Sequence, residues 1–288
     1  MSQYVQAVGK HPAVYEEFEP WGGFVPGPFN NAAAVRALLM MHISTMFGSS
    51  EAVTPGGIAH GAGDAWLIAL NRQMAASGRP TYIRLFAEMD GNWNPYCAYN
   101  ANGTRRDAAH SVGAFVKAWR RITLIFRGGP LRVLNARLHG LGMPALRQGH
   151  DLPKPKVAML WVPQVAGNPD IPGNQPRAYW PGRAYVDWVG TDFYSNSPNF
   201  SGLNAFYAEF PGFPFVFGEF AIWKTGDDPS FIQALFAWVG SHTRTRMLIY
   251  NQGVNPTGPF RLYRYPHSAA ALRAHLKSST FPAFAPGL

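Results

Sequence analysis

The chain has 288 residues, of which 47% are hydrophobic and 14% charged, and this balance excludes a disordered chain and argues against a coiled coil. The formal net charge of +9 would suit an anionic partner, but the basic residues are scattered in short groups and form no tail or stripe. The single cysteine excludes an intrachain disulfide, and no apolar run is long enough to span a membrane.

Seven short runs rich in β-branched and aromatic residues are predicted strands. Each is followed by a loop with Gly, Pro, Asn or Ser and then, in most cases, by a helix-like stretch. Runs such as KVAMLWVP and PFVFGEFA are apolar at nearly every position, which is typical of parallel strands covered on both faces. The seven runs lie at 12–18, 38–45, 81–88, 156–163, 186–194, 214–221 and 245–252.

Five stretches between these runs have the apolar spacing of helices. They lie at 62–77, 107–127, 203–210, 229–239 and 267–276. Strands that alternate with helices along the chain predict an α/β fold, and at this length we expect a (β/α)8 TIM barrel in a single domain, 1–288. A doubly wound sheet is the alternative, which the lack of a GxGxxG or Walker loop disfavours.

Seven strands are one fewer than such a barrel contains. Residues 1–9 resemble the end of a helix, so we expect that the first barrel strand is missing from this chain or supplied upstream of it. The Gly- and Pro-rich stretch 130–155 follows the longest predicted helix, and we interpret it as an excursion within the domain.

Two glutamates stand at the ends of predicted strands, where barrel enzymes place their catalytic groups. Glu88 closes the third run and Glu219 the sixth, so they would face each other across one barrel mouth. A carboxylate at the end of a buried strand is unfavourable unless it is hydrogen-bonded or used in chemistry, and for Glu88 a salt bridge to Arg84 is the structural alternative. Paired carboxylates across a cleft are the apparatus of glycoside hydrolysis.

The segments around these glutamates resemble glycoside hydrolase family 26, the β-mannanase family. The resemblance spans about residues 9–275, and the combination of motifs is far more specific than any one of them. The motifs are Arg84…Glu88-Met89-Asp90-Gly91-Asn92-Trp93, Ala118-Trp119-Arg120-Arg121-Ile122, Trp161-Val162-Pro163-Gln164, Tyr179-Trp180-Pro181-Gly182, Tyr185-Val186-Asp187-Trp188 and Gly218-Glu219-Phe220.

This resemblance implies a retaining enzyme with Glu88 as the general acid/base and Glu219 as the nucleophile. Retention would require the two carboxyl groups to lie about 5–5.5 Å apart, and the charge of the nucleophile would raise the pKa of the acid. It also implies that Tyr194 hydrogen-bonds the nucleophile. Two positions depart from the family, since Ala87 replaces a usual His and Asp90 stands where Asn is common. These departures bear on the choice of sugar more than on the hydrolase chemistry.

Further side chains at strand ends are candidates for binding sugar. Flat aromatic faces suit the apolar face of a pyranose ring, and the alternative for each is core or rim packing. Trp93 and Trp161 are the strongest, because the resemblance places them beside the acid/base. The whole set is Trp21, Trp93, Trp161, Tyr194, Trp223, Tyr250, His42, Ser44, Asn92, Gln164, Asp192 and Asn251. Arg84 shares a face with Glu88 and is expected to support its carboxylate from below, whereas Asp187 is interpreted as structural.

The leading interpretation is a retaining endo-β-glycoside hydrolase that cleaves β-1,4-mannosidic bonds in mannan-type polysaccharide. One alternative keeps this mechanism but acts on β-glucan or xylan, and another is a catalytically silent barrel that binds acidic glycan or nucleic acid. We expect a monomer with a polysaccharide substrate, no nucleic-acid or membrane partner, no cofactor and no metal, since the two-carboxylate mechanism needs none. A polymer-degrading enzyme is expected to be extracellular, although the first residues lack the apolar region of a signal peptide.

Overall fold

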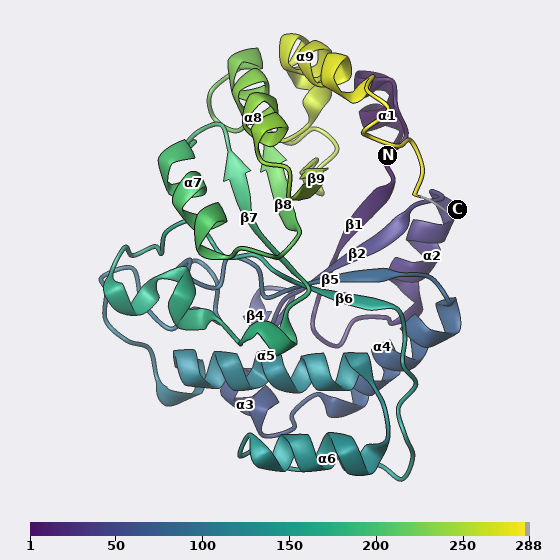
Figure 1. Ribbon diagram of the computed structural model, residues 1–288, viewed down its shortest axis with the longest axis vertical. Helices are drawn as coiled ribbons and strands as arrows, with labels where there is room; N and C mark the ends of the chain where they lie inside the picture. Colours follow the sequence, from purple (N-terminus) through teal and green to yellow (C-terminus); the bar gives the residue numbers. More distant parts are fainter. Residues whose placement is uncertain (286–288) are drawn as a thin grey trace. The chain divides into compact units, whose positions relative to one another are not determined.

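A computed structural model describes residues 1–285 and shows an α/β chain (Figure 1). Its helices are α1 (Ser2–Val8), α2 (Pro26–Ala34), α3 (Pro55–Ala59), α4 (Asp64–Ser77), α5 (Val112–Arg127), α6 (Leu131–Gly140), α7 (Phe200–Glu209), α8 (Pro229–Ser241) and α9 (Pro266–Leu276). Its strands are β1 (Val14–Glu19), β2 (Leu38–Ile43), β3 (Met46–Phe47), β4 (Ser50–Glu51), β5 (Thr81–Leu85), β6 (Val157–Trp161), β7 (Trp188–Tyr194), β8 (Phe215–Ala221) and β9 (Thr245–Tyr250).

The seven longer strands coincide with the seven predicted runs. Their order in the sheet is β1-β2-β5-β6-β7-β8-β9, and β3 and β4 form a separate hairpin. The pairs β2–β5, β5–β6, β7–β8 and β8–β9 are parallel. Parallel strands linked through helices in chain order are the arrangement of a TIM barrel, so the predicted fold class is confirmed.

The chain divides into two compact units. Unit 1 comprises Met1–Tyr15, Ala32–Leu38 and Val189–Leu288, and unit 2 comprises Glu16–Asn31 and Leu39–Trp188. Unit 1 contains β8 and β9 with α1, α7, α8 and α9, and unit 2 contains β5 and β6 with α3, α4, α5 and α6.

In unit 2 the longest helix, α5, ends at Arg127 as the sequence predicts, but it begins at Val112 and not at Asp107, because Asp107 caps a separate short turn over Ala108–His110. Ser111 accepts a hydrogen bond from the N–H of Ala114 at its N-terminus, and Gly128 adopts a φ of 64° directly after its last residue. Its buried side chains include Phe115, Trp119 and Ile122, and it lies beside α3, α4 and α6 (Figure 1).

Three helices were not predicted, and their sequences explain why. The helix α2 contains two prolines and a glycine, and α3 begins Pro55-Gly56-Gly57, residues with low helix propensity. The third, α6, lies in the 130–155 stretch that we interpreted as an excursion. In each case local composition obscured a helix, which shows how weak propensity is as a guide to short helices.

In unit 1 the strand β8 is buried at every position. Phe215 and Phe217 of β8 pack against Trp238 of α8, with ring centroids 5.8 and 5.5 Å apart. Asp228 accepts the N–H of Phe231 and so caps the N-terminus of α8. No helix among residues 1–285 is long and apolar enough to cross a bilayer.

Candidate active site

Glu88 of unit 2 lies just beyond the end of β5 and not within the strand. The predicted run 81–88 is longer than β5, which ends at Leu85, because Phe86 and Glu88 have φ angles of 46° and 52°. Side chains other than glycine rarely adopt this left-handed region, so the surrounding bonds must stabilise the turn. The N–H of Glu88 donates to the carbonyl of Val162 at 2.7 Å, and its carbonyl accepts the Asn94 side-chain amide at 2.8 Å.

Two N–H donors hold the Glu88 carboxylate, one on each oxygen. The indole Nε1 of Trp93 donates to Oε2 at 2.8 Å, and the amide Nε2 of Gln164 donates to Oε1 at 2.5 Å. Gly91 allows the Trp93 ring to come close, since a Cβ at Gly91 would lie 2.4 Å from that ring. Gln164 was predicted to bind sugar hydroxyls, and its contact with Glu88 gives it a role that spacing alone did not suggest.

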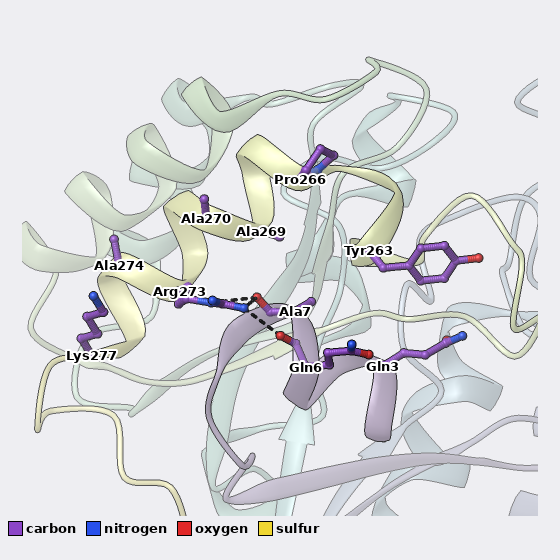
Figure 2. A pocket seen from close by; sticks show the side chains of 10 residues that line it. All are labelled: Gln3, Gln6, Ala7, Tyr263, Pro266, Ala269, Ala270, Arg273, Ala274 and Lys277. Carbon is purple, nitrogen blue, oxygen red and sulfur yellow. Dashed lines mark hydrogen bonds between the residues drawn. The ribbon is translucent and has the colours of Figure 1, made fainter.

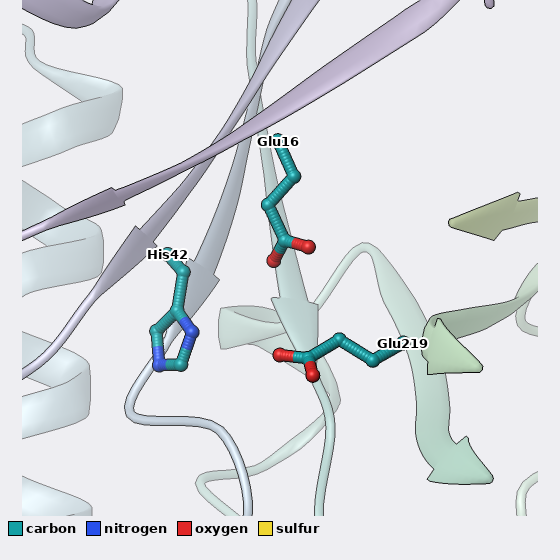
Figure 3. A group of neighbouring side chains, drawn as sticks. All are labelled: Glu16, His42 and Glu219. Carbon is teal, nitrogen blue, oxygen red and sulfur yellow. The ribbon is translucent and has the colours of Figure 1, made fainter. Parts of the chain in front are cut away.

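A buried ion pair lies on β1, β2 and β5 of the same unit. Arg84 Nη1 donates to Glu16 Oε1 at 2.9 Å and to His42 Nδ1 at 2.8 Å, and Figure 3 shows Glu16 and His42. Because a guanidinium only donates, Nδ1 of His42 must accept and its proton lies on Nε2. Burial, and then the Arg84 cation, lowers the pKa of His42 well below its usual value, so the ring is a neutral hydrogen-bond donor.

Glu16 and His42 are residue types that can ligate a metal, but Arg84 occupies a ligand atom of each. A guanidinium beside both atoms would repel a cation, so this pair does not suit a metal ion. Glu16 was missing from the predicted site. Glu16 and Phe18 are two residues apart in β1, so their side chains lie on the same face of the strand. The Phe18 ring lies 4.7 Å from that of His42, so this two-residue spacing could have placed Glu16 near His42 as well.

Glu219 of unit 1 lies inside β8, with 6% of its surface exposed. The hydroxyl of Tyr194 donates to Glu219 Oε2, which is the contact that the family resemblance implied for this tyrosine. The amide of Asn251 donates to the same oxygen at 2.6 Å and to the Tyr194 hydroxyl at 3.1 Å. Asn251 had been predicted to bind sugar hydroxyls, and it follows β9 directly.

Irregular pairing accompanies Glu219 on both sides of β8. The register with β7 shifts between Thr191 and Asp192, and this shift brings Asp192 opposite Glu219. The register with β9 shifts between Phe217 and Phe220. Such bulges turn side chains locally and are common near active sites. Asp192 is 6% exposed, and its position opposite Glu219 identifies it as part of the same local cluster.

The candidate aromatic residues fall into exposed and buried groups. Trp93 is 51% exposed and offers a ring face to solvent. Trp161 is fully buried against Trp180, and Tyr250 is buried beside Phe220. Burial raises the pKa of the Tyr250 hydroxyl far above its usual value, as expected for a packed tyrosine.

The remaining candidates lie in local contacts within their own units. In unit 1, Trp223 packs edge-on against Tyr194, with ring centroids 5.5 Å apart. In unit 2, Trp21 is buried and packs on Trp66 at 4.8 Å, and Asn92 donates to Asn168 Oδ1 at 2.9 Å. The Oγ of Ser44 accepts the N–H of Met46. Asp187 accepts both Arg127 and the N–H of Met159, contacts that fit a structural role.

A cavity of about 390 Å³ lies elsewhere in unit 1, between α1 and α9 (Figure 2). Its main cation, Arg273, donates to the carbonyls of Gln6 and Ala7 and therefore fastens α1 to α9. Among the described residues, the lining of this cavity contains no acidic residue, so it does not offer the paired carboxylates of glycoside hydrolysis. Its lining residues are Gln3, Gln6, Ala7, Tyr263, Pro266, Ala269, Ala270, Arg273, Ala274 and Lys277.

Comparison with solved structures finds the same fold in glycoside hydrolase family 26. A mannanase of Bacillus subtilis matches with a TM-score of 0.59 and 16% identity, over 94% of this chain and 78% of that one. A modular endo-β-1,4-mannanase from Cellulomonas fimi matches with a TM-score of 0.55 and 18% identity, over 99% and 70% of the two chains. The GH26 domain of an endo-β-mannanase/endo-β-glucanase from Prevotella bryantii matches with a TM-score of 0.53 and 13% identity, over 97% and 84%.

At the level of sequence, no family model and no curated protein matches this chain. The structural matches nevertheless extend across nearly the whole chain, so the protein shares the fold of the family 26 mannanases that its motifs resemble.

Proposed function

We propose that the protein is a retaining endo-β-glycoside hydrolase that cleaves β-1,4-mannosidic bonds in mannan-type polysaccharide. The observation that carries the proposal is that Glu88, just beyond β5, and Glu219, within β8, each accept two side-chain hydrogen bonds. Gln164, Tyr194 and Asn251 donate from the ends of neighbouring strands, and Trp93 donates from the loop after β5. Carboxyl groups oriented in this way suit two-step glycoside hydrolysis. The fold shared with family 26 mannanases supports the same reaction.

In the first step, an oxygen of Glu219 attacks the anomeric carbon and forms a covalent glycosyl-enzyme. The bond to the leaving oxygen breaks, and Glu88 transfers its proton to that oxygen. Tyr194 and Asn251 keep the Glu219 carboxylate in one orientation through their bonds to Oε2. Orienting the nucleophile before substrate binds lowers the entropic part of the barrier.

In the second step, Glu88 is a carboxylate and takes a proton from water. The water oxygen attacks the anomeric carbon, and Glu219 leaves with its electron pair. Trp93 and Gln164 stabilise the carboxylate form of Glu88 that this step requires, because each donates an N–H to it. The exposed ring of Trp93 is also available to stack on a sugar beside the reacting bond.

Reducing-sugar release from β-mannan, glucomannan, lichenan and xylan tests this proposal. Release from mannan should disappear in Glu88→Ala and in Glu219→Ala, and it should persist in Glu209→Ala, which changes an exposed glutamate on α7. Release from lichenan or xylan alone would change the sugar but keep the mechanism. Undiminished activity in either active-site variant would end the assignment. Because a polymeric substrate does not cross a cell membrane, we also propose an extracellular site of action.

A further inference from the structure

Asp90 is a fully buried acid in the turn that carries Glu88. Its Oδ1 accepts the main-chain N–H of Gln164 at 2.9 Å. Its Oδ2 is buried and has no hydrogen-bond partner among the described residues. Arg106, a cation on the following segment, donates to the main-chain carbonyls of Asn92, Asn94 and Pro95 and not to this oxygen. The mechanism above leaves Asp90 without a function.

The surroundings of Asp90 favour a neutral carboxylic acid over a carboxylate. A negative oxygen without solvent or a donor is highly unfavourable in a protein interior, whereas a protonated one is tolerated. Burial, together with the charge of Glu88, raises the pKa of Asp90 well above its usual value. Cys97 and Tyr179 are the other titratable groups close to this cluster, and burial raises the pKa of both, so both are neutral as well.

The main chain of Asp90 also joins two loops. Its carbonyl accepts the N–H of Asn168 and the side-chain amide of Asn174, each at 2.8 Å. Gly91 and Asn168 then pair as an isolated bridge. The loop after β5 is therefore tied to the loop after β6 at Asp90, and Gln164 lies at the start of the second loop.

We propose that Asp90 is a positioning residue that fixes the main chain of Gln164, so that the Gln164 amide is directed at the carboxylate of Glu88. The inference rests on the proposed function, in which Glu88 is the acid/base. The two contacts form one chain, from Asp90 Oδ1 to the N–H of Gln164 and from Gln164 Nε2 to Glu88 Oε1. Trp93 holds the other oxygen independently, so the influence of Asp90 on Glu88 runs through Gln164.

A double-mutant cycle on kcat tests this path. Asp90→Ala removes the acceptor and should lower kcat by about tenfold with little change in KM, as should Gln164→Ala. In the Gln164→Ala background, Asp90→Ala should add less than about twofold. Asp90→Asn keeps a neutral side chain with an acceptor oxygen and should retain kcat within about twofold. Additive losses, or an Asp90→Asn variant as impaired as Asp90→Ala, would overturn the proposal.

A titration of Glu88 by carboxyl-carbon NMR gives a readout that needs no substrate. Gln164→Ala and Asp90→Ala should each raise the titration midpoint of Glu88 by about one pH unit, because the first removes and the second displaces the Gln164 amide that favours the carboxylate. Asp90→Asn should leave the midpoint unchanged. If Asp90 were ionised, Asp90→Asn would lower the midpoint, and this result alone overturns the proposal even if Asp90→Ala does not fold. An inactive wild type with the expected midpoints would instead count against the proposed function only.

Discussion

The carboxyl groups of Glu88 and Glu219 have different local structures. Glu88 lies in a left-handed turn beyond β5, partly exposed, with one N–H donor on each oxygen. Glu219 lies within a fully buried strand, and an O–H from Tyr194 and an N–H from Asn251 converge on its Oε2. Within its own unit, each carboxylate thus has a distinct set of donors.

The difference agrees with the two roles that we propose. A nucleophile must stay in one place, and a strand with two donors on one oxygen holds the carboxylate there. An acid/base must exchange a proton with the leaving oxygen and with water, which a partly exposed turn residue can do. Similar pairs of carboxyl groups take different roles because their environments differ.

The largest expected effect comes from removing either carboxylate and adding azide. Glu88→Ala and Glu219→Ala should each lose about 10⁴-fold or more in kcat on mannan. With an activated aryl β-glycoside, azide should rescue Glu219→Ala by direct attack and give a glycosyl azide of inverted configuration. Azide should rescue Glu88→Ala by attacking the glycosyl-enzyme and give the retained product, because two inversions then occur.

The stereochemistry of these products, read by proton NMR, separates the two roles. Retained product from the Glu219 variant and inverted product from the Glu88 variant would reverse the assignment. The same configuration from both variants would contradict a two-step mechanism. The matched control is Glu209→Ala, in which added azide should leave the products of the wild-type reaction unchanged.

A second, smaller effect is expected when one donor is removed from each carboxylate. Tyr194→Phe and Trp93→Phe both keep an aromatic ring and delete one donor. A hydrogen bond to a charged group contributes about 1.5–3 kcal/mol, so each variant should lose about 10- to 100-fold in kcat/KM on mannan. The two should differ on an activated aryl glycoside, whose leaving group needs no proton from Glu88.

On that substrate Trp93→Phe should recover most of its kcat/KM, whereas Tyr194→Phe should stay impaired because its carboxylate is the nucleophile. Equal losses for both variants on both substrates would remove the distinction between the two donor sets. Such a result would indicate that these side chains support the local fold and not the separate roles.

The sequence predicts the scaffold of this site better than its contacts. Six of the seven long strands lie within predicted runs, and β1 extends one residue beyond its run to Glu19, because short apolar runs with turn residues after them are a strong local signal. Glu88 and Glu219 were found because charged residues are rare at the ends of such runs. The turn at Glu88 was missed, since a left-handed φ at a glutamate depends on bonds to Val162 and Asn94 from other segments.

The partners of the carboxylates were harder to predict, because strand ends show which residues share an edge but not which atoms meet. Gln164 and Asn251 were placed at strand ends, yet both donate to the candidate catalytic glutamates. Trp161 was favoured as a sugar platform and is fully buried. An aromatic residue at the end of an apolar run has the same local pattern whether it packs inward or faces solvent.

Glu19 provides a third strand-end carboxyl group for the comparison, and it lacks the donors that Glu88 and Glu219 have. It closes β1, is 6% exposed, and its Oε1 has no hydrogen-bond partner within residues 1–285. Gly23 lies so close that a Cβ there would be 2.1 Å from this oxygen. Burial, with the charge of Glu17 as a further cause, raises the pKa of Glu19 to about 7.

Since the pKa of Glu19 is higher in the folded than in the unfolded chain, its contribution to stability is full below about pH 4.5 and is lost as the pH rises through about 7. Glu19→Gln removes this ionisation and should gain up to about 2 kcal/mol over the wild type between pH 5 and pH 8. Urea unfolding at the two pH values measures the gain, with Glu209→Gln as an exposed control that should show none. An equal gain in the free energy of unfolding at both pH values would mean that a donor hydrogen-bonds the Glu19 carboxylate in solution. Glu19 would then be a hydrogen-bonded carboxylate like Glu88 and Glu219.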